Sequence, residues 1–130
     1  MKPIDLMLGD WVLWNNRYVQ IVRTCAYACY NGHRVWLAHC NDDNFIEWHD
    51  ISTISPIPLT HEILEKNGWK ETQYWHEYQD GKNTIQCCLP DMRGVINGIE
   101  IEHFKCEYVH QYQHLLRLCG LDELADNFKI

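Results

Sequence analysis

The sequence predicts an α+β protein in which a small SH3-like β-barrel at the amino terminus packs on a unit of helix, strands and helix. Five short β-rich segments joined by tight turns fill residues 1–55. Two prolines then interrupt the pattern at Ser55-Pro56-Ile57-Pro58, and capped helical segments follow only after them. We therefore expect a barrel over residues 1–55 and an α+β unit over residues 56–130, together forming one compact globule.

The strands of the first half are marked by turn residues. The first, residues 10–14, ends at Asn15-Asn16, a pair that tolerates positive φ in a two-residue hairpin loop. In its expected partner, residues 17–24, Tyr18 and Gln20 alternate with Val19 and Ile21, so the two pairs fall on opposite faces of a strand. Further strands are expected over residues 33–40, 45–48 and 50–54, with a polar turn at residues 41–44.

The first helix has clear signals at both ends. Thr60 is a good N-cap residue, and Leu59 and Leu64 have the spacing of a hydrophobic staple. Asn67-Gly68 supplies the stop, so we expect a helix over residues 60–67.

Beyond this helix, strands are expected before a second helical segment. We predict strands at residues 71–78 and 83–89, a loop at 91–94, and strand material at 94–101 and 103–106. A longer helix over residues 107–119 carries an apolar stripe at helical spacing, and Asp122 is expected to cap a short turn that ends at Asn127.

Composition excludes several classes of protein. The 130 residues are 46% hydrophobic and 22% charged, which rules out a disordered chain or a coiled coil. The net charge of −7 argues against a domain that binds nucleic acid through a basic face. Seven cysteines without a signal-like amino terminus or a membrane-length apolar run predict a soluble cytoplasmic protein with free thiols.

Two motifs resemble those of a known family. The segment IPLTHEILEKNGW (residues 57–69) and the segment YVHQYQHL (residues 108–115) resemble the IPLT-x-EILEKNG and VHQ-x-Q motifs of small uncharacterised proteins from Bacteroides-type bacteria, their phages and mobile elements. The start LGDWV (residues 8–12) resembles that family's IGNWV, whereas residues 114–121 depart from its usual pattern. The resemblance implies a compact cytoplasmic protein of mobile-element origin and implies no reaction.

Two sets of residues have metal-ligand types. His110 and His114 lie four apart on the expected last helix, and His103 or Cys106 would be the nearest third ligand. The alternative is a polar helix face. The second set consists of cysteines and histidines in the first half of the chain: Cys25, Cys29, His33, His39 and Cys40. The alternative interpretation is that the thiols pack as small apolar groups and the histidines lie at the rim.

Residues for catalysis do not form a recognised pattern. Serine occurs only at positions 52 and 55, and the phosphate-loop and Gly-x-Ser-x-Gly patterns are missing from the sequence. Cys87 and Cys88 would point to opposite faces of a strand, and Glu100 and Glu102 are typical of a solvated face. We therefore expect neither an enzyme nor a cofactor, with a metal-assisted hydrolase that uses His110 and His114 as the enzymatic alternative.

Aromatic residues beside turns of the first half indicate a binding surface, since Trp, Tyr and Arg are enriched at protein interfaces. We predict a non-enzymatic protein that binds a host or phage protein, for example in an anti-defence role, or alternatively a small ligand such as a nucleotide. The same aromatic residues would otherwise fill the interface between the two halves. The predicted binding residues are Trp14, Arg17, Tyr18, Tyr30, Arg34 and Trp36.

Overall fold

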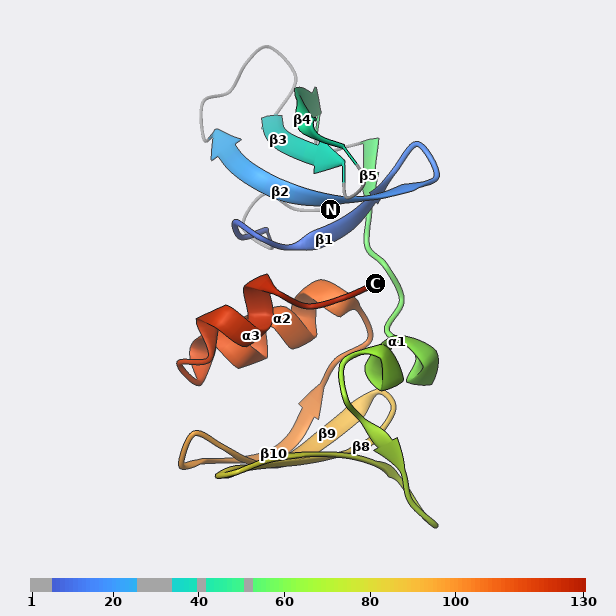
Figure 1. Cartoon of the computed structure of the whole chain (residues 1–130), viewed down its shortest axis with the longest axis vertical. Coiled ribbons are helices and arrows are strands. Elements are labelled where there is room, and N and C mark those ends of the chain that lie inside the picture. Colours follow the sequence, from blue (N-terminus) through green and yellow to red (C-terminus); the bar gives the residue numbers. More distant parts are fainter. Residues whose placement is uncertain (1–5, 26–33, 40–41, 51–52) are drawn as a thin grey trace. The chain divides into compact units, whose positions relative to one another are not determined.

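The structure is a computed structural model that describes residues 6–25, 34–39, 42–50 and 53–130, with side chains for residues 6–22 and 53–130. The chain divides into two compact units, Met1–Ile57 and Pro58–Ile130. Their described elements are three helices and two five-stranded antiparallel sheets (Figure 1), which confirms the α+β class. Both sheets are open over the described residues, so the expected closed barrel is not confirmed.

The first unit contains the strands β1 (Trp11–Trp14), β2 (Arg17–Cys25), β3 (Arg34–His39), β4 (Asp42–Asp50) and β5 (Ile54–Ser55). Their order in the sheet is β4-β3-β2-β1-β5, so the last strand returns to pair with the first. β4 begins three residues earlier than predicted, because pairing with β3 resumes at His39 and Asp42 after an irregularity in the register.

The predicted hairpin between β1 and β2 is confirmed. Asn15 and Asn16 form the two-residue loop with φ values of 49° and 59°, which suit the right-handed twist of the flanking strands. Val12 and Val19 face each other across the hairpin and are fully buried. They pack in a small core with Leu6, Ile21 and Ile54.

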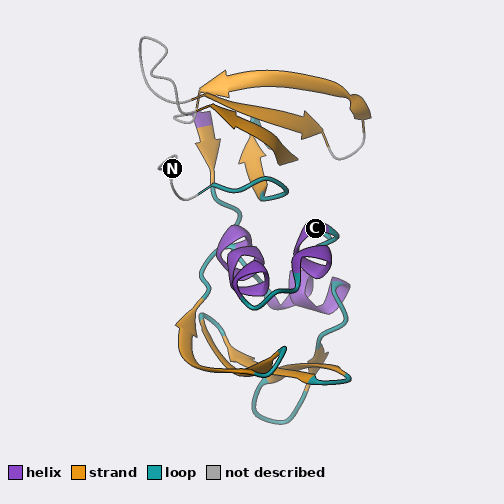
Figure 2. Ribbon diagram, turned by 90° about the vertical axis from the view of Figure 1, so that its left-hand side faces the viewer, coloured by secondary structure: helices purple, strands orange, loops and turns teal. Residues whose placement is uncertain are grey.

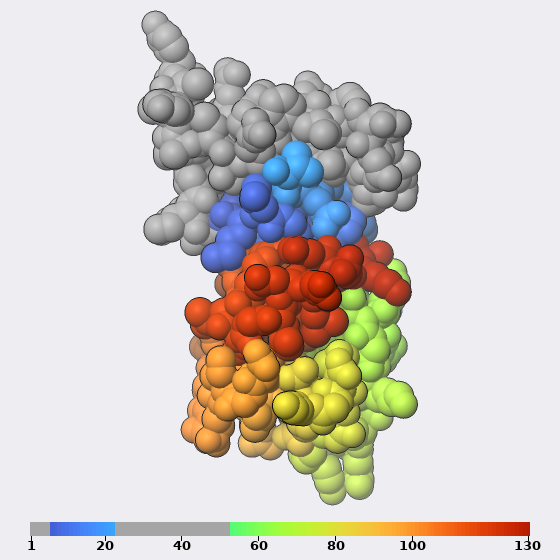
Figure 3. Space-filling view, turned by 60° about the vertical axis from the view of Figure 1, so that its left-hand side comes forward, coloured from blue at the N-terminus to red at the C-terminus, as the bar shows by residue number. Residues whose placement is uncertain are grey.

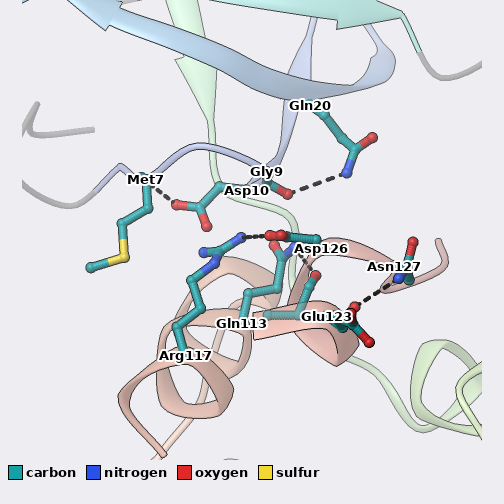
Figure 4. Close-up of polar contacts among 10 residues, drawn as sticks. Met7, Gly9, Asp10, Gln20, Gln113, Arg117, Glu123, Asp126 and Asn127 are labelled. Carbon is teal, nitrogen blue, oxygen red and sulfur yellow. Dashed lines mark hydrogen bonds and ion pairs between the residues drawn. The ribbon is translucent and has the colours of Figure 1, made fainter. Parts of the chain in front are cut away.

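A tight turn precedes β1. The Asp10 carboxylate accepts a hydrogen bond from the Met7 backbone N–H at 2.7 Å, and the Gln20 side chain donates to the Gly9 carbonyl at 3.3 Å (Figure 4). These bonds satisfy backbone groups where the chain enters the sheet.

The second unit begins with α1 (His61–Lys66). As predicted, Thr60 is its N-cap and accepts a hydrogen bond from the Ile63 backbone N–H. At its other end the Asn67 side chain donates to the Lys129 carbonyl and accepts from the Lys129 N–H, both at 2.8 Å, which fixes the last residues of the chain to α1.

Five antiparallel strands follow α1: β6 (Lys70–Glu71), β7 (His76–Asp80), β8 (Asn83–Cys88), β9 (Asp91–Ile96) and β10 (Ile99–Lys105). They are ordered β10-β9-β8-β7-β6, which is a simple meander. The helices α2 (Val109–Leu118) and α3 (Asp122–Asp126) close the unit.

All three helices lie on the same side of this sheet (Figures 1 and 2). The predicted stripe of α2 is confirmed, since Val109, Tyr112, Leu115, Leu116 and Cys119 are all at most 3% exposed. They pack in the same unit as the buried strand residues Ile85, Met92 and Ile96. None of the described helices has the length and apolarity that a membrane-crossing helix requires.

Side-chain hydrogen bonds hold the end of α2 to α3. The Gln113 side chain donates to the Ala125 carbonyl at 3.0 Å, and Arg117 lies 3.2 Å from Asp126 (Figure 4). Gln113 is completely buried, so its hydrogen bond offsets the cost of removing an amide from water.

Three predictions in the second unit, two of strands and one of a loop, were wrong. The strand expected over residues 71–78 is divided by a turn, in which Thr72 donates through both its backbone N–H and its hydroxyl to the Trp75 carbonyl. The loop expected at residues 91–94 is part of β9. The real turns are Leu89-Pro90 and Asn97-Gly98, and the second divides the strand expected at 94–101.

Candidate functional site

The outer face of the second sheet, opposite the helices, carries polar and aromatic side chains. Alternation along β8 buries Ile85 and Cys87 and leaves Gln86 and Cys88 on the other side. The register pairs Gln86 with Arg93 and Cys88 with Asp91, so these four residues share this outer face. Together with Trp75 and His103 they line a cavity of about 220 Å³, which we call the outer cavity.

His103 enters the outer cavity from an irregular position. It has φ of 53°, and the pairing of β10 with β9 shifts between Ile101 and Phe104. A non-glycine residue in this region stores strain, and such strain is typical of functional positions. Its Nδ1 lies 3.1 Å from Asp91 Oδ2, so the carboxylate orients the ring.

Trp75 and Arg93 form the other wall of the outer cavity. The guanidinium carbon of Arg93 lies 5.8 Å from the centre of the Trp75 ring, within the range of a cation–π contact. The indole Nε1 of Trp75 is buried, and among the described residues it has no hydrogen-bond acceptor. Buried donors without a partner are uncommon in folded proteins.

The cysteines beside the outer cavity do not form a nucleophile–base pair in this structure. The exposed Cys88 thiol donates to the Tyr74 carbonyl at 3.5 Å. Burial, followed by the proximity of Cys88, raises the pKa of Cys87 to about 11, so this thiol stays protonated at neutral pH. The residue types of a Cys–His–Asp site are present, but the described contacts are between Cys88 and the Tyr74 carbonyl and between His103 and Asp91.

A second polar cluster lies under the end of α1. Single donor atoms of Glu65, Glu71 and His76 all lie within 4.8 Å of one another, and the ring of His61 stacks on that of His76 with centroids 3.9 Å apart. We call these four residues the His76 cluster. Over the described residues, Glu65, Glu71 and His76 are the one group of three or more side chains spaced to hold a metal ion.

Another hollow, of about 500 Å³, is lined by residues of α3 and of the ends of β7 and β8. Figure 3 shows these segments next to each other, in red and yellow. The hollow is shallow, and its charged lining residues are all acidic: Asp80, Asp122 and Glu123. These exposed side chains are typical of a solvated surface.

The binding residues predicted from the sequence are only partly described. Trp14 is half-buried against the first core, whereas Arg17 and Tyr18 are exposed. Adjacent strand positions point to opposite faces, so Tyr18 faces away from Arg17 and its partner Trp14. Arg34 and Trp36 lie in β3 with undescribed side chains, and Tyr30 lies outside the described residues.

The first of the two candidate metal-ligand sets in the sequence is not assembled among the described side chains. His110 is buried, and its ring meets His114 edge-on with centroids 5.5 Å apart. Among the described side chains, this pair gathers no third ligand, and the proposed third ligand His103 bonds Asp91 instead. The set of Cys25, Cys29, His33, His39 and Cys40 falls outside the described side chains.

Sequence reasoning missed both the outer cavity and the His76 cluster. One signal was present: His61 and Glu65 lie four apart on the predicted first helix, the spacing that places two side chains on one face. The other members come from β6 and β7, whose pairing depended on a turn that the sequence did not reveal.

No family model, curated protein or solved structure matches this chain. The candidate sites therefore rest on their own geometry.

Proposed function

We propose that the protein is a non-enzymatic binding protein that engages a partner polypeptide through the outer face of its second sheet. The observation that carries this proposal is the Trp75 ring with Arg93 over it in the wall of the outer cavity, where the buried Trp75 Nε1–H has no acceptor among the described residues. Trp and Arg are also the residue types that dominate binding energy at protein interfaces.

The size of the outer cavity favours one group of a large partner. Its volume of about 220 Å³ is below the ~300–1,000 Å³ of typical small-molecule sites. A nucleotide would leave most of its surface in water, whereas a single side chain or backbone carbonyl of a protein would fit. The outer cavity thus supports a polypeptide partner over the nucleotide alternative.

The charge of the second unit indicates the character of the partner. Residues 58–130 contain 12 acidic and 7 basic side chains, a formal charge of −5. Glu77 and Glu100 lie on the same outer face as Arg93, by alternation and register. A partner with a basic surface that inserts a neutral acceptor, such as a carbonyl or amide oxygen, would match both charge and hydrogen bonding.

The sequence-derived binding face stays a competing proposal. In that version Trp14 and Trp36 of the first unit contact the host or phage protein, in an anti-defence role of a cytoplasmic protein of mobile-element origin. The return of β5 to the edge of β1 supports an SH3-like fold for this unit, since such a return is what curls a meander towards a barrel.

Quantitative capture from host lysate decides between the two faces. The wild type is compared with Trp75→Ala/Arg93→Ala, with Trp14→Ala/Trp36→Ala, and with Gln79→Ala as an outward-facing control outside the outer cavity. We expect the partner to be lost, by at least about tenfold, only from the Trp75/Arg93 variant. Retention there and loss from the Trp14/Trp36 variant would overturn the proposal, provided circular dichroism shows that all variants fold. A co-purifying nucleotide would favour the small-ligand alternative.

A further inference from the structure

The His76 cluster brings together side chains from three elements. Glu65 comes from α1, Glu71 from β6 and His76 from the start of β7. Glu71 and His76 are direct partners in the β6–β7 pairing, so the turn at residues 72–75 sets their separation. His61 lies one helical turn before Glu65 on α1 and stacks on His76.

We propose that the His76 cluster binds one divalent transition-metal ion, with Glu65, Glu71 and His76 as ligands. Their donor atoms lie within 4.8 Å of one another, so small side-chain rotations bring each to the ~2.0–2.2 Å that an ion requires. Two carboxylates and one neutral imidazole carry a charge of −2, which balances the ion. None of these three ligands lines the outer cavity, which adjoins the site, and none of them belongs to the His110–His114 pair.

His76 is buried whereas Glu65 and Glu71 are exposed, and the buried imidazole distinguishes this group from a simple surface ion pair. His76 is only 8% exposed, and its Nε2 lies 3.4 Å from Glu65 Oε1, longer than the usual charge-assisted hydrogen bond. An ion pair with His76 would need only the Glu65 carboxylate. A carboxylate oxygen of Glu71 also lies within 4.8 Å of both groups. A second carboxylate beside the first adds repulsion, which a bound cation would relieve.

The ligand types select the metal. Imidazole with carboxylates suits Zn²⁺ and related first-row ions, whereas Mg²⁺ prefers oxygen ligands and keeps its waters. His61 and His76 also border a solvent-accessible cavity of about 360 Å³, so a coordination position stays open to water or to the imidazole of His61. Three protein ligands with one open position is the arrangement of an exchangeable or reactive zinc site rather than a closed structural one.

Calorimetric titration of untagged protein with ZnCl₂, and separately with MgCl₂, tests the proposal. We expect a site of one Zn²⁺ per chain and no binding of Mg²⁺ in the same range. Glu65→Gln and Glu71→Gln should each lower the zinc affinity of this site by about tenfold or more, because loss of a residue that only orients a metal ligand already lowers metal affinity by that much. Glu62→Gln, an exposed change on the same helix outside the cluster, should leave it unchanged.

Two further readouts separate this site from zinc held elsewhere. Zn²⁺ should raise the thermal unfolding temperature of the wild type and of Glu62→Gln but not of Glu65→Gln/Glu71→Gln. The NMR signals of the His76 ring nitrogens should shift on titration. Equal zinc affinity in the double variant, or unchanged His76 signals in the wild type, would overturn the proposal even if zinc binds at the cysteines and histidines of residues 25–40.

Discussion

The two faces of the second sheet are built from the same five strands but differ in what covers them. The inner face packs under α1, α2 and α3 with apolar side chains such as Ile85, Met92 and Ile96, all at most 1% exposed. The outer face carries Gln86, Cys88, Asp91 and Arg93, with the outer cavity among them. Strand alternation thus lets one sheet bury one set of side chains under the helices and present the other set to solvent, although residues of the two sets lie one position apart.

Substitution of Gly94, in β9, has the largest expected effect on the free energy of unfolding. Gly94 has φ of 144°, and a Cβ there would overlap the Thr84 carbonyl oxygen of the neighbouring strand. Gly94→Ala should therefore cost about 4 kcal/mol of the free energy of unfolding, from backbone strain and overpacking together. Urea titration measures it.

Gly98→Ala is the matched control for this change. Gly98 also has positive φ, at 79°, but its Cβ would meet no atom within 4 Å. The control should lose only about 1 kcal/mol, from the left-handed conformation alone. Equal losses at both glycines would show that the approach of β9 to β8 is looser than described.

Two leucines of α2 test the inner face. Leu116 is completely buried, whereas Leu118, two residues later, is 75% exposed. Leu116→Ala should lower the free energy of unfolding by about 3 kcal/mol, because it leaves a cavity. Leu118→Ala should change it by less than about 0.5 kcal/mol. A substantial loss at Leu118 would mean that this side of α2 is covered in solution, and chemical denaturation of both variants decides it.

A further expected effect is a loss of stability at alkaline pH. Burial raises the pKa of the inner-face thiol Cys87 to about 11 and that of Cys106 to about 12, from an ordinary value of 9.0. The folded state therefore holds these protons more tightly than the unfolded chain. Their contribution is fully present below pH 9 and is lost as the pH rises from 9 to about 12.

Cys106→Ala isolates this effect. Its free energy of unfolding should be lower at neutral pH but should fall less steeply between pH 9 and 11 than that of the wild type. Tyr78, whose pKa burial also raises, keeps part of the slope in both proteins. Parallel pH profiles in urea denaturation would contradict the assignment to Cys106.

Local signals in the sequence were sufficient for several elements of the fold. The Asn15-Asn16 loop, the Thr60 cap and the stripe of α2 each depend on residues within one or two turns, and each was predicted. The errors arose where a local signal had two meanings. Asp91 and Gly94 are typical of loops, but here Asp91 pairs with Cys88 across a two-residue turn and Gly94 accommodates the neighbouring strand.

The candidate sites could not be predicted because their residues meet only through strand pairing. Glu71 reaches His76 through a turn closed by Thr72, and the sequence pattern favoured an unbroken strand there. The pairing register of β10 with β9 shifts just before Phe104, and His103 lies at this shift, where it contacts Asp91. The sequence around the shift has no pattern that predicts it. Sequence periodicity predicts which face of the sheet a side chain occupies, but it does not predict which side chains of the other strands lie beside it.

The edges of the second sheet have a consequence for how other chains can approach it. One edge, β6, is only two residues long, and the other, β10, is interrupted at His103 and carries Glu100, Glu102 and Lys105. Short, irregular and charged edges discourage another strand from joining the ladder. These edges protect the sheet against edge-to-edge aggregation, and the partner polypeptide proposed above would contact side chains on a face rather than add a sixth strand.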